Sequence, residues 1–158
     1  MNVLVRLAKL FAVVAGALMT VITLITCGSL IGRNTTGVTL MGDYELTAVT
    51  AGAAVALFLP WCQIKRGNII VDFFTANASA NATALMDRLG SLVLAVVMGL
   101  IAWRTVFGAI NAYESQTTTM MLGFPEWVAY ASIAPGLALT CAIALTQAVK
   151  GDFKEQAQ

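Results

Sequence analysis

The stretch LFAVVAGALMTVITLITCGSLI, from Leu10 to Ile31, carries no charged residue and is bounded by Lys9 and Arg33. A transmembrane helix needs about 20 mostly apolar residues to cross about 30 Å of hydrocarbon, because each residue adds about 1.5 Å. This stretch meets that requirement. It is too long for the apolar part of a signal peptide and lacks a small-residue cleavage pattern, so we expect a retained helix.

The whole chain has the composition of a membrane protein. Its 158 residues are 59% hydrophobic and 11% charged, whereas a soluble domain carries about 25% charged residues. Nine Lys and Arg with eight Asp and Glu are too few to cover a soluble fold of this size. The net charge of +1 and the lack of a basic run argue against a nucleic-acid-binding protein.

Three further apolar windows follow the first one. The sequence therefore predicts an all-α integral membrane protein, a single four-helix domain over 1–158, with transmembrane helices at about 10–31, 46–64, 87–112 and 127–149. The third window needs an explanation, since only roughly 22 Å of helix separates Arg88 from Arg104. We expect this helix to continue past Arg104, whose side chain can reach the interface or pair with an acid on a neighbour.

The positions of Lys and Arg predict the orientation of the helices. Seven of these residues lie on the side shared by both termini and the middle loop: Arg6, Lys9, Lys65, Arg66, Arg88, Lys150 and Lys154. Only Arg33 and Arg104 lie on the other side. Because cytoplasmic loops carry the excess of positive charge, both termini are predicted to be cytoplasmic. Trp127 would then belong to the outer aromatic belt.

The segment between the second and third helices, QIKRGNIIVDFF, combines charges with an apolar run. Lys65 and Arg66 are predicted to anchor the second helix at the anionic inner surface, and Gly67 permits a sharp turn. The isoleucines and phenylalanines of 69–74 would share one face of a helix, with Asp72 pointing elsewhere. We expect an interfacial segment here.

The four windows hold few groups that could perform chemistry. Histidine is absent, and Cys27, Cys62 and Cys141 are far apart in apolar sequence. No acid or lysine lies midway along a window, so we predict no catalytic residue, no metal site and no cofactor, and hence no enzyme. Hydroxyl groups in the first window are expected to bond mainly to their own helix: Thr20, Thr23, Thr26 and Ser29.

Small residues recur at helical spacing in three of the windows. They are Gly28 and Gly32, then Ala48, Gly52 and Ala56, then Ala95 and Gly99. Faces of this kind let two helices approach closely. The pattern therefore predicts a protein that packs against other helices.

Several motifs together resemble one family. Arg33 closes the first helix, Glu45 opens the second, KRGNIIVDFF follows it, and QTTTMMLGFPEWVAYASIAPGLAL leads into the fourth. This combination resembles the small permease subunit of tripartite ATP-independent periplasmic (TRAP) transporters. The residues that match the family's patterns are Lys65, Arg66, Gly67, Ile70, Val71, Asp72, Leu122, Gly123, Pro125, Trp127, Tyr130, Pro135 and Gly136.

The resemblance implies a role in a bacterial inner membrane. In such systems a periplasmic binding protein captures an organic acid, and a large permease subunit moves it together with sodium. The small subunit is implied to be a non-catalytic scaffold for the large one. Arg33 and Glu45 are then candidates for contact with a partner, and Arg104, Pro125 and Trp127 for packing at the outer end.

Two other functions remain open at this point. A stand-alone oligomeric four-helix channel or small exporter would need a polar path between copies. An enzyme or electron-transfer anchor is disfavoured by the lack of histidine.

Overall fold

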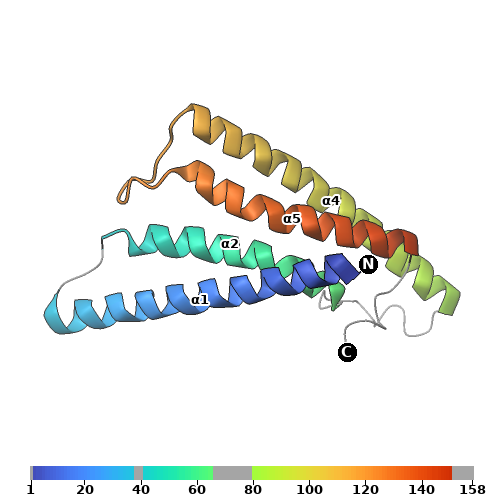
Figure 1. The fold of residues 1–158 in the computed structure, drawn as a ribbon, viewed down its shortest axis with the longest axis horizontal. Helices are drawn as coiled ribbons and strands as arrows, with labels where there is room; N and C mark the ends of the chain where they lie inside the picture. Colours follow the sequence, from blue (N-terminus) through green and yellow to red (C-terminus); the bar gives the residue numbers. More distant parts are fainter. Residues whose placement is uncertain (1, 38–40, 66–79, 151–158) are drawn as a thin grey trace.

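The computed structural model describes residues 2–37, 41–65 and 80–150. In this part of the chain it has four helices that are long and apolar enough to cross a membrane, as predicted. They are α1 (Asn2–Thr36), α2 (Asp43–Ile64), α4 (Ala80–Glu114) and α5 (Glu126–Lys150) (Figure 1). The predicted interfacial segment after Lys65 lies outside the described residues.

Each predicted window lies inside one of these helices, but the first and third helices are much longer than their windows. α1 and α4 have 35 residues each, which corresponds to about 52 Å of helix. α4 continues through Arg104 to Glu114. Helices of this length tilt in a bilayer of about 30 Å or extend beyond its hydrocarbon region.

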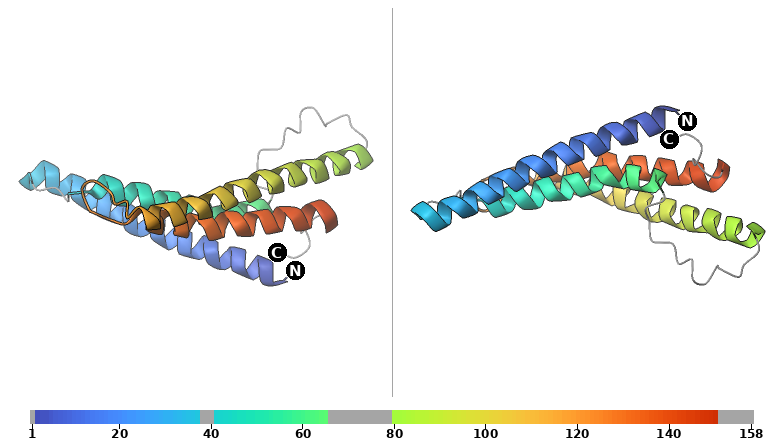
Figure 2. Two further views of the ribbon diagram at one scale, coloured as in Figure 1. Left: turned by 90° about the horizontal axis from the view of Figure 1, so that it is seen from above. Right: turned by 90° about the horizontal axis from the view of Figure 1, so that it is seen from below.

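The helices form an open row in the order α1, α2, α5, α4. α2 packs against both α1 and α5, and α4 packs against α5. Near the chain termini α1 also contacts α5, where Ala8, Ile64 and Ile143 form a buried cluster. Figure 1 shows this order, and Figure 2 shows α1 and α4 diverging toward the end that carries the termini. We call this the terminal end. The opposite end, where α1 leads into α2 and α4 into α5, is called the loop end.

The contact between α2 and α5 depends on a proline and a glycine. Pro60 is fully buried within α2, and because it has no N–H it cannot bond to the carbonyl of Ala56 one turn earlier. Gly136 of α5 lies directly against that carbonyl, so closely that a Cβ atom would overlap it. The missing hydrogen bond and the missing side chain thus permit a close crossing of the two helices.

Other small residues also lie where α5 meets its neighbours. A Cβ atom at Gly52 would be 3.8 Å from Ile133, and one at Gly99 would be 3.2 Å from Cys141 Sγ. The Cys141 thiol donates a hydrogen bond to the Ala95 carbonyl at 3.2 Å. The small-residue faces of α2 and α4 therefore pack within the chain, against α5.

A buried pair of amides joins α2 and α5 near the terminal end. Gln63 Nε2 donates to the side-chain Oε1 of Gln147 at 2.6 Å. Gln147 Nε2 in turn donates to the backbone carbonyl oxygen of Gln63 at 3.1 Å. Both side chains are buried, at 5% and 4% exposure. A buried polar group is costly without a partner, so this reciprocal pair fixes how α2 and α5 align.

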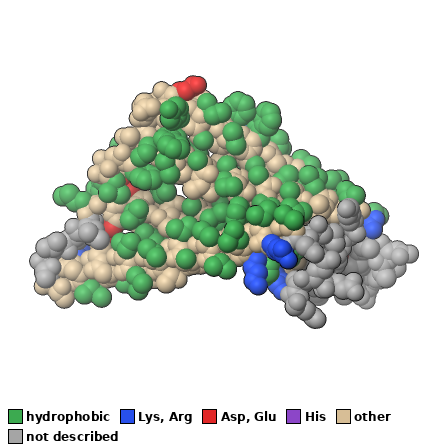
Figure 3. All heavy atoms as spheres, in the orientation of Figure 1, with side chains coloured by type: hydrophobic (Ala, Val, Ile, Leu, Met, Phe, Trp, Pro, Cys, Tyr) green, Lys and Arg blue, Asp and Glu red, His purple; other side chains and the backbone are tan. Residues whose placement is uncertain are grey.

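The helical surface is apolar between charged ends. In Figure 3, hydrophobic side chains cover much of the visible face, Lys and Arg gather beside the terminal end, and acidic side chains lie toward the loop end. The described acidic residues at the loop end are Asp43, Glu45, Glu114 and Glu126. This distribution is the one expected for helices whose middle sections contact hydrocarbon.

Candidate functional site

Most of the candidate residues that the structure describes lie at the loop end, and Glu45 organises it. Glu45 lies in the first turn of α2. Its Oε1 accepts the backbone N–H of Met121 at 2.9 Å, and its Oε2 accepts that of Leu122 at 3.0 Å. The carboxylate also suits the positive end of the helix dipole. One side chain thus joins the start of α2 to a loop 76 residues later.

The loop between α4 and α5 is a compact hairpin. The Thr119 N–H donates to the Phe124 carbonyl at 2.9 Å, and the Phe124 N–H donates back to Thr119 Oγ1 at 3.1 Å. Gly123 adopts φ +63°, a conformation that favours glycine, and its N–H donates to the Thr119 carbonyl. The N–H groups of Thr119, Gly123 and Phe124 are thus hydrogen-bonded within the hairpin. The N–H groups of 121–122 point toward Glu45 instead.

Leu122 covers the turn that begins α2. Gly42 precedes α2 with φ +80°, and the Leu122 side chain occupies the space where a Cβ atom of residue 42 would lie. Any side chain at Gly42 would therefore displace Leu122 and strain the backbone. The Glu45 hydrogen bonds and this contact hold the hairpin against α2 together.

A polar seam joins α1 to α2 near the same end. Ser29 Oγ donates to Asp43 Oδ2 at 2.7 Å, and the hydroxyl oxygens of Thr26 and Thr47 are 3.2 Å apart. Thr26 also bonds to its own helix, as expected. The same holds for Thr20 and Thr23. Ser29 differs from the expectation because the first turn of α2 brings a carboxylate within its reach.

The hairpin presents an apolar tip. Met120 is fully exposed and Met121 is 73% exposed, although both lie in a hairpin whose backbone is well ordered by hydrogen bonds. Large exposed apolar groups of this kind mark contact surfaces. We call residues 120–122 the hairpin tip.

Two of the residues assigned to packing at the outer end, Pro125 and Trp127, make contacts within the chain at the loop end. Trp127 makes an edge-to-face contact with Tyr113, with ring centroids 5.9 Å apart, which ties the start of α5 to the end of α4. Pro125 is half-buried and forms a bridge with Thr118 at the base of the hairpin.

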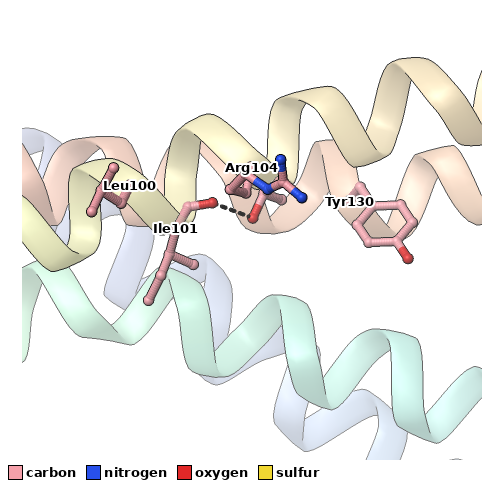
Figure 4. A pocket seen from close by; sticks show the side chains of 5 residues that line it. Leu100, Ile101, Arg104 and Tyr130 are labelled. Carbon is pink, nitrogen blue, oxygen red and sulfur yellow. Dashed lines mark hydrogen bonds between the residues drawn. The ribbon is translucent and has the colours of Figure 1, made fainter.

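The arginines predicted from the sequence are less enclosed. Arg33 is exposed in the last turn of α1. Arg104 is exposed on α4, where it lines a shallow hollow of about 330 Å³ together with Leu100, Ile101, Thr105 and Tyr130 (Figure 4).

The predicted anchor at the inner surface can be followed only in part. Lys65 ends α2, and its Nζ lies 5.4 Å from the centroid of the Trp61 ring, in a cation–π contact. Arg66, Gly67 and Asp72 lie outside the described residues.

The pairing of Gln63 with Gln147 was not predicted from the sequence. The signal was present, because an amide inside an apolar window needs a hydrogen-bonding partner, and a second window contains one. Nor was it predicted that Glu45, a candidate for partner contact, bonds to a loop of its own chain. In the described ranges, no group of three or more His, Cys, Asp or Glu side chains could hold a metal ion.

Comparison with known proteins gives a family match. The sequence model of the family described as "Tripartite ATP-independent periplasmic transporters, DctQ component" matches residues 22–154. No curated protein and no solved structure matches the chain.

Proposed function

Since the chain belongs to the DctQ family of tripartite ATP-independent periplasmic transporters, we propose that it is the fixed scaffold subunit of such a transporter. In this proposal it does not bind the transported organic acid or sodium. Both are handled by the large permease subunit, which uses the sodium gradient to take up an acid delivered by the periplasmic binding protein. The complex resides in the bacterial inner membrane.

The open row of helices is the observation that carries this proposal. Only 11% of the apolar span of α1 and 6% of that of α4 is buried within the chain, against 33% for α2 and 28% for α5. The edge helices thus offer long apolar surfaces to a partner, while the central helices hold each other in place. A static wall needs such surfaces and no ionisable group midway through the membrane.

We place both termini in the cytoplasm. The support is the charge distribution, since Arg6, Lys9, Lys65 and Arg88 lie toward the terminal end and most of the acids toward the loop end. The loop end would then face the periplasm, where the binding protein arrives. There we assign direct contact to Arg33 and the hairpin tip, and to Glu45 the task of positioning that tip.

A reconstitution experiment tests the scaffold role. The large subunit is purified with and without this chain and placed in liposomes with a sodium gradient, the binding protein and a labelled organic acid. We expect uptake only when both membrane subunits are present, and no flux through liposomes that hold this chain alone.

Two results would contradict the proposal. Uptake by the large subunit at full rate without this chain would remove the scaffold role. Ion or solute flux through liposomes that contain this chain alone would favour the stand-alone channel instead.

A further inference from the structure

The hollow around Arg104 is lined by residues of α4 and by Tyr130 of α5. Arg104 is ten positions before the end of α4 at Glu114, which places its Cα about 15 Å from that end. Tyr130 lies in the second turn of α5, and its ring packs against Gly108 of α4, 3.5 Å from where a Cβ atom would be. The hollow therefore lies along the half of α4 nearest the loop end.

The lining of the hollow changes from apolar to polar along α4. Leu100 and Ile101, 62% and 44% exposed, line the side toward the middle of the membrane. Arg104 and Thr105 follow toward the loop end, and Tyr130 lies beyond them. Figure 4 shows the Arg104 guanidinium extending along α4 in the direction of Tyr130. A tyrosine ring with a polar tip is typical of the membrane interface.

The direction of Arg104 places its guanidinium on the polar side of the hollow, where an anion could meet it. Side chains on a helix tilt toward its N-terminus, which for α4 is the terminal end, so Arg104 turns against this tilt to approach the loop-end interface. A guanidinium inside a membrane is costly without an anion, and its planar fork suits a phosphate with two hydrogen bonds.

We propose that the hollow formed by Leu100, Ile101, Arg104, Thr105 and Tyr130 binds a phospholipid of the loop-end leaflet. Arg104 holds the phosphate, and an acyl chain lies over Leu100 and Ile101. A lipid of that leaflet has its phosphate toward the interface and its chains toward the membrane centre, and this is the order of the lining. A carboxylate on a partner helix could also bind Arg104, but it would leave the apolar part of the hollow, at Leu100 and Ile101, without a role.

The test uses the full chain in a neutral detergent, with retained lipid measured by native mass spectrometry. Dioleoyl-phosphatidylglycerol is the probe. Dioleoylglycerol has the same chains without the phosphate, and glycerol phosphate has the phosphate without the chains. The variants are Arg104→Gln, Arg104→Lys and, as a matched control cation, Arg33→Gln. Circular dichroism checks that each variant keeps its helices.

We expect the unaltered chain to retain phosphatidylglycerol, with Arg104→Gln weakening this binding about tenfold and Arg104→Lys weakening it less. Arg33→Gln should bind as the unaltered chain does. Neither dioleoylglycerol nor glycerol phosphate should compete. Equal retention by Arg104→Gln, an equal loss in Arg33→Gln, or displacement by glycerol phosphate alone would overturn the proposal.

A second measurement separates lipid from a partner carboxylate. When the chain is co-purified with the large subunit in lipid-depleted detergent, Arg104→Gln should leave the yield of the complex unchanged. Loss of the complex would assign Arg104 to a protein carboxylate and overturn the lipid site. Neither readout depends on transport, so this inference can fail while the scaffold role stands.

Discussion

The centre of the row and its edges are both apolar, but they are built from different residues. Where α2 crosses α5, the contact consists of Gly136 against Ala56, the buried Pro60, and the paired amides of Gln63 and Gln147. The edges present large aliphatic side chains, such as Leu24 on α1 and Val93 on α4, at 67% and 62% exposure.

This difference follows from the solvent. Lipid chains are as apolar as leucine, so hydrophobicity does not drive helices together within the membrane. Close packing of small residues and satisfied polar pairs do, and these are the features at the centre. α1 and α4 make such contacts only on the faces that meet α2 and α5. Their other faces, which carry the large exposed side chains, are left for lipid or for another subunit.

The largest loss of stability is expected from Gly136→Val. The new side chain would overlap the Ala56 carbonyl and force α2 and α5 apart, at a cost of about 3 kcal/mol in the free energy of unfolding. Thermal unfolding in neutral detergent, followed by circular dichroism, measures the effect.

Gly28→Val on α1 is the matched control, because a Cβ atom there would have nothing within 4 Å. It should change the free energy of unfolding by no more than about 0.5 kcal/mol. Equal stability of the two variants would mean that α2 and α5 do not cross closely at Gly136.

Gln147→Leu should have the next largest effect. It removes the two hydrogen bonds described above between Gln63 and Gln147, and we expect a loss of about 1 to 2 kcal/mol. When Gln63 and Gln147 are both changed to Leu, the loss in the free energy of unfolding should be smaller than the sum of the two single losses. In each single variant one buried amide loses its bond to the other, whereas the double variant buries neither amide. Additive losses in a double-mutant cycle would argue against direct pairing.

A smaller, local effect is expected from Glu45→Ala. The backbone N–H groups of Met121 and Leu122 would lose their acceptors, so their hydrogen exchange should become roughly tenfold faster. Exchange measured by mass spectrometry on peptides that cover the hairpin reports this directly. Glu114→Ala makes the same change of charge on an exposed residue at the loop end and should leave the exchange of 121–122 as it was.

The apolar windows of the sequence were sufficient to predict four helices able to span a membrane, because the hydrocarbon sets a minimum length that few other segments satisfy. The spacing of Gly52, Ala56, Ala95 and Gly99 also identified the close-packing faces of α2 and α4. The order of the row could not be predicted in this way, since hydropathy is the same for a face that meets a helix and one that meets lipid.

The loop end shows the same limit for single residues. Glu45 was recognised as an acid that opens a helix, which depends only on its neighbours in the sequence. Its binding to the hairpin depends on a loop 76 and 77 residues away and on the space above Gly42. Likewise, Ser29 was expected to bond to its own helix, and only the position of Asp43 in the fold changes that outcome.

The edge helices are expected to show the smallest effect on the chain's own stability and a separate effect on assembly. Leu24→Trp on α1 and Val93→Trp on α4 add bulk to side chains that are mostly exposed, so each should change the free energy of unfolding by no more than about 0.5 kcal/mol. Co-purification with the large subunit should nevertheless fall for the variant whose helix faces that subunit, because a misfitting side chain prevents close helix packing. Each variant is the control for the other. If both assemble normally, neither tested position lies in the subunit contact, and the apolar edges would then be explained by lipid alone.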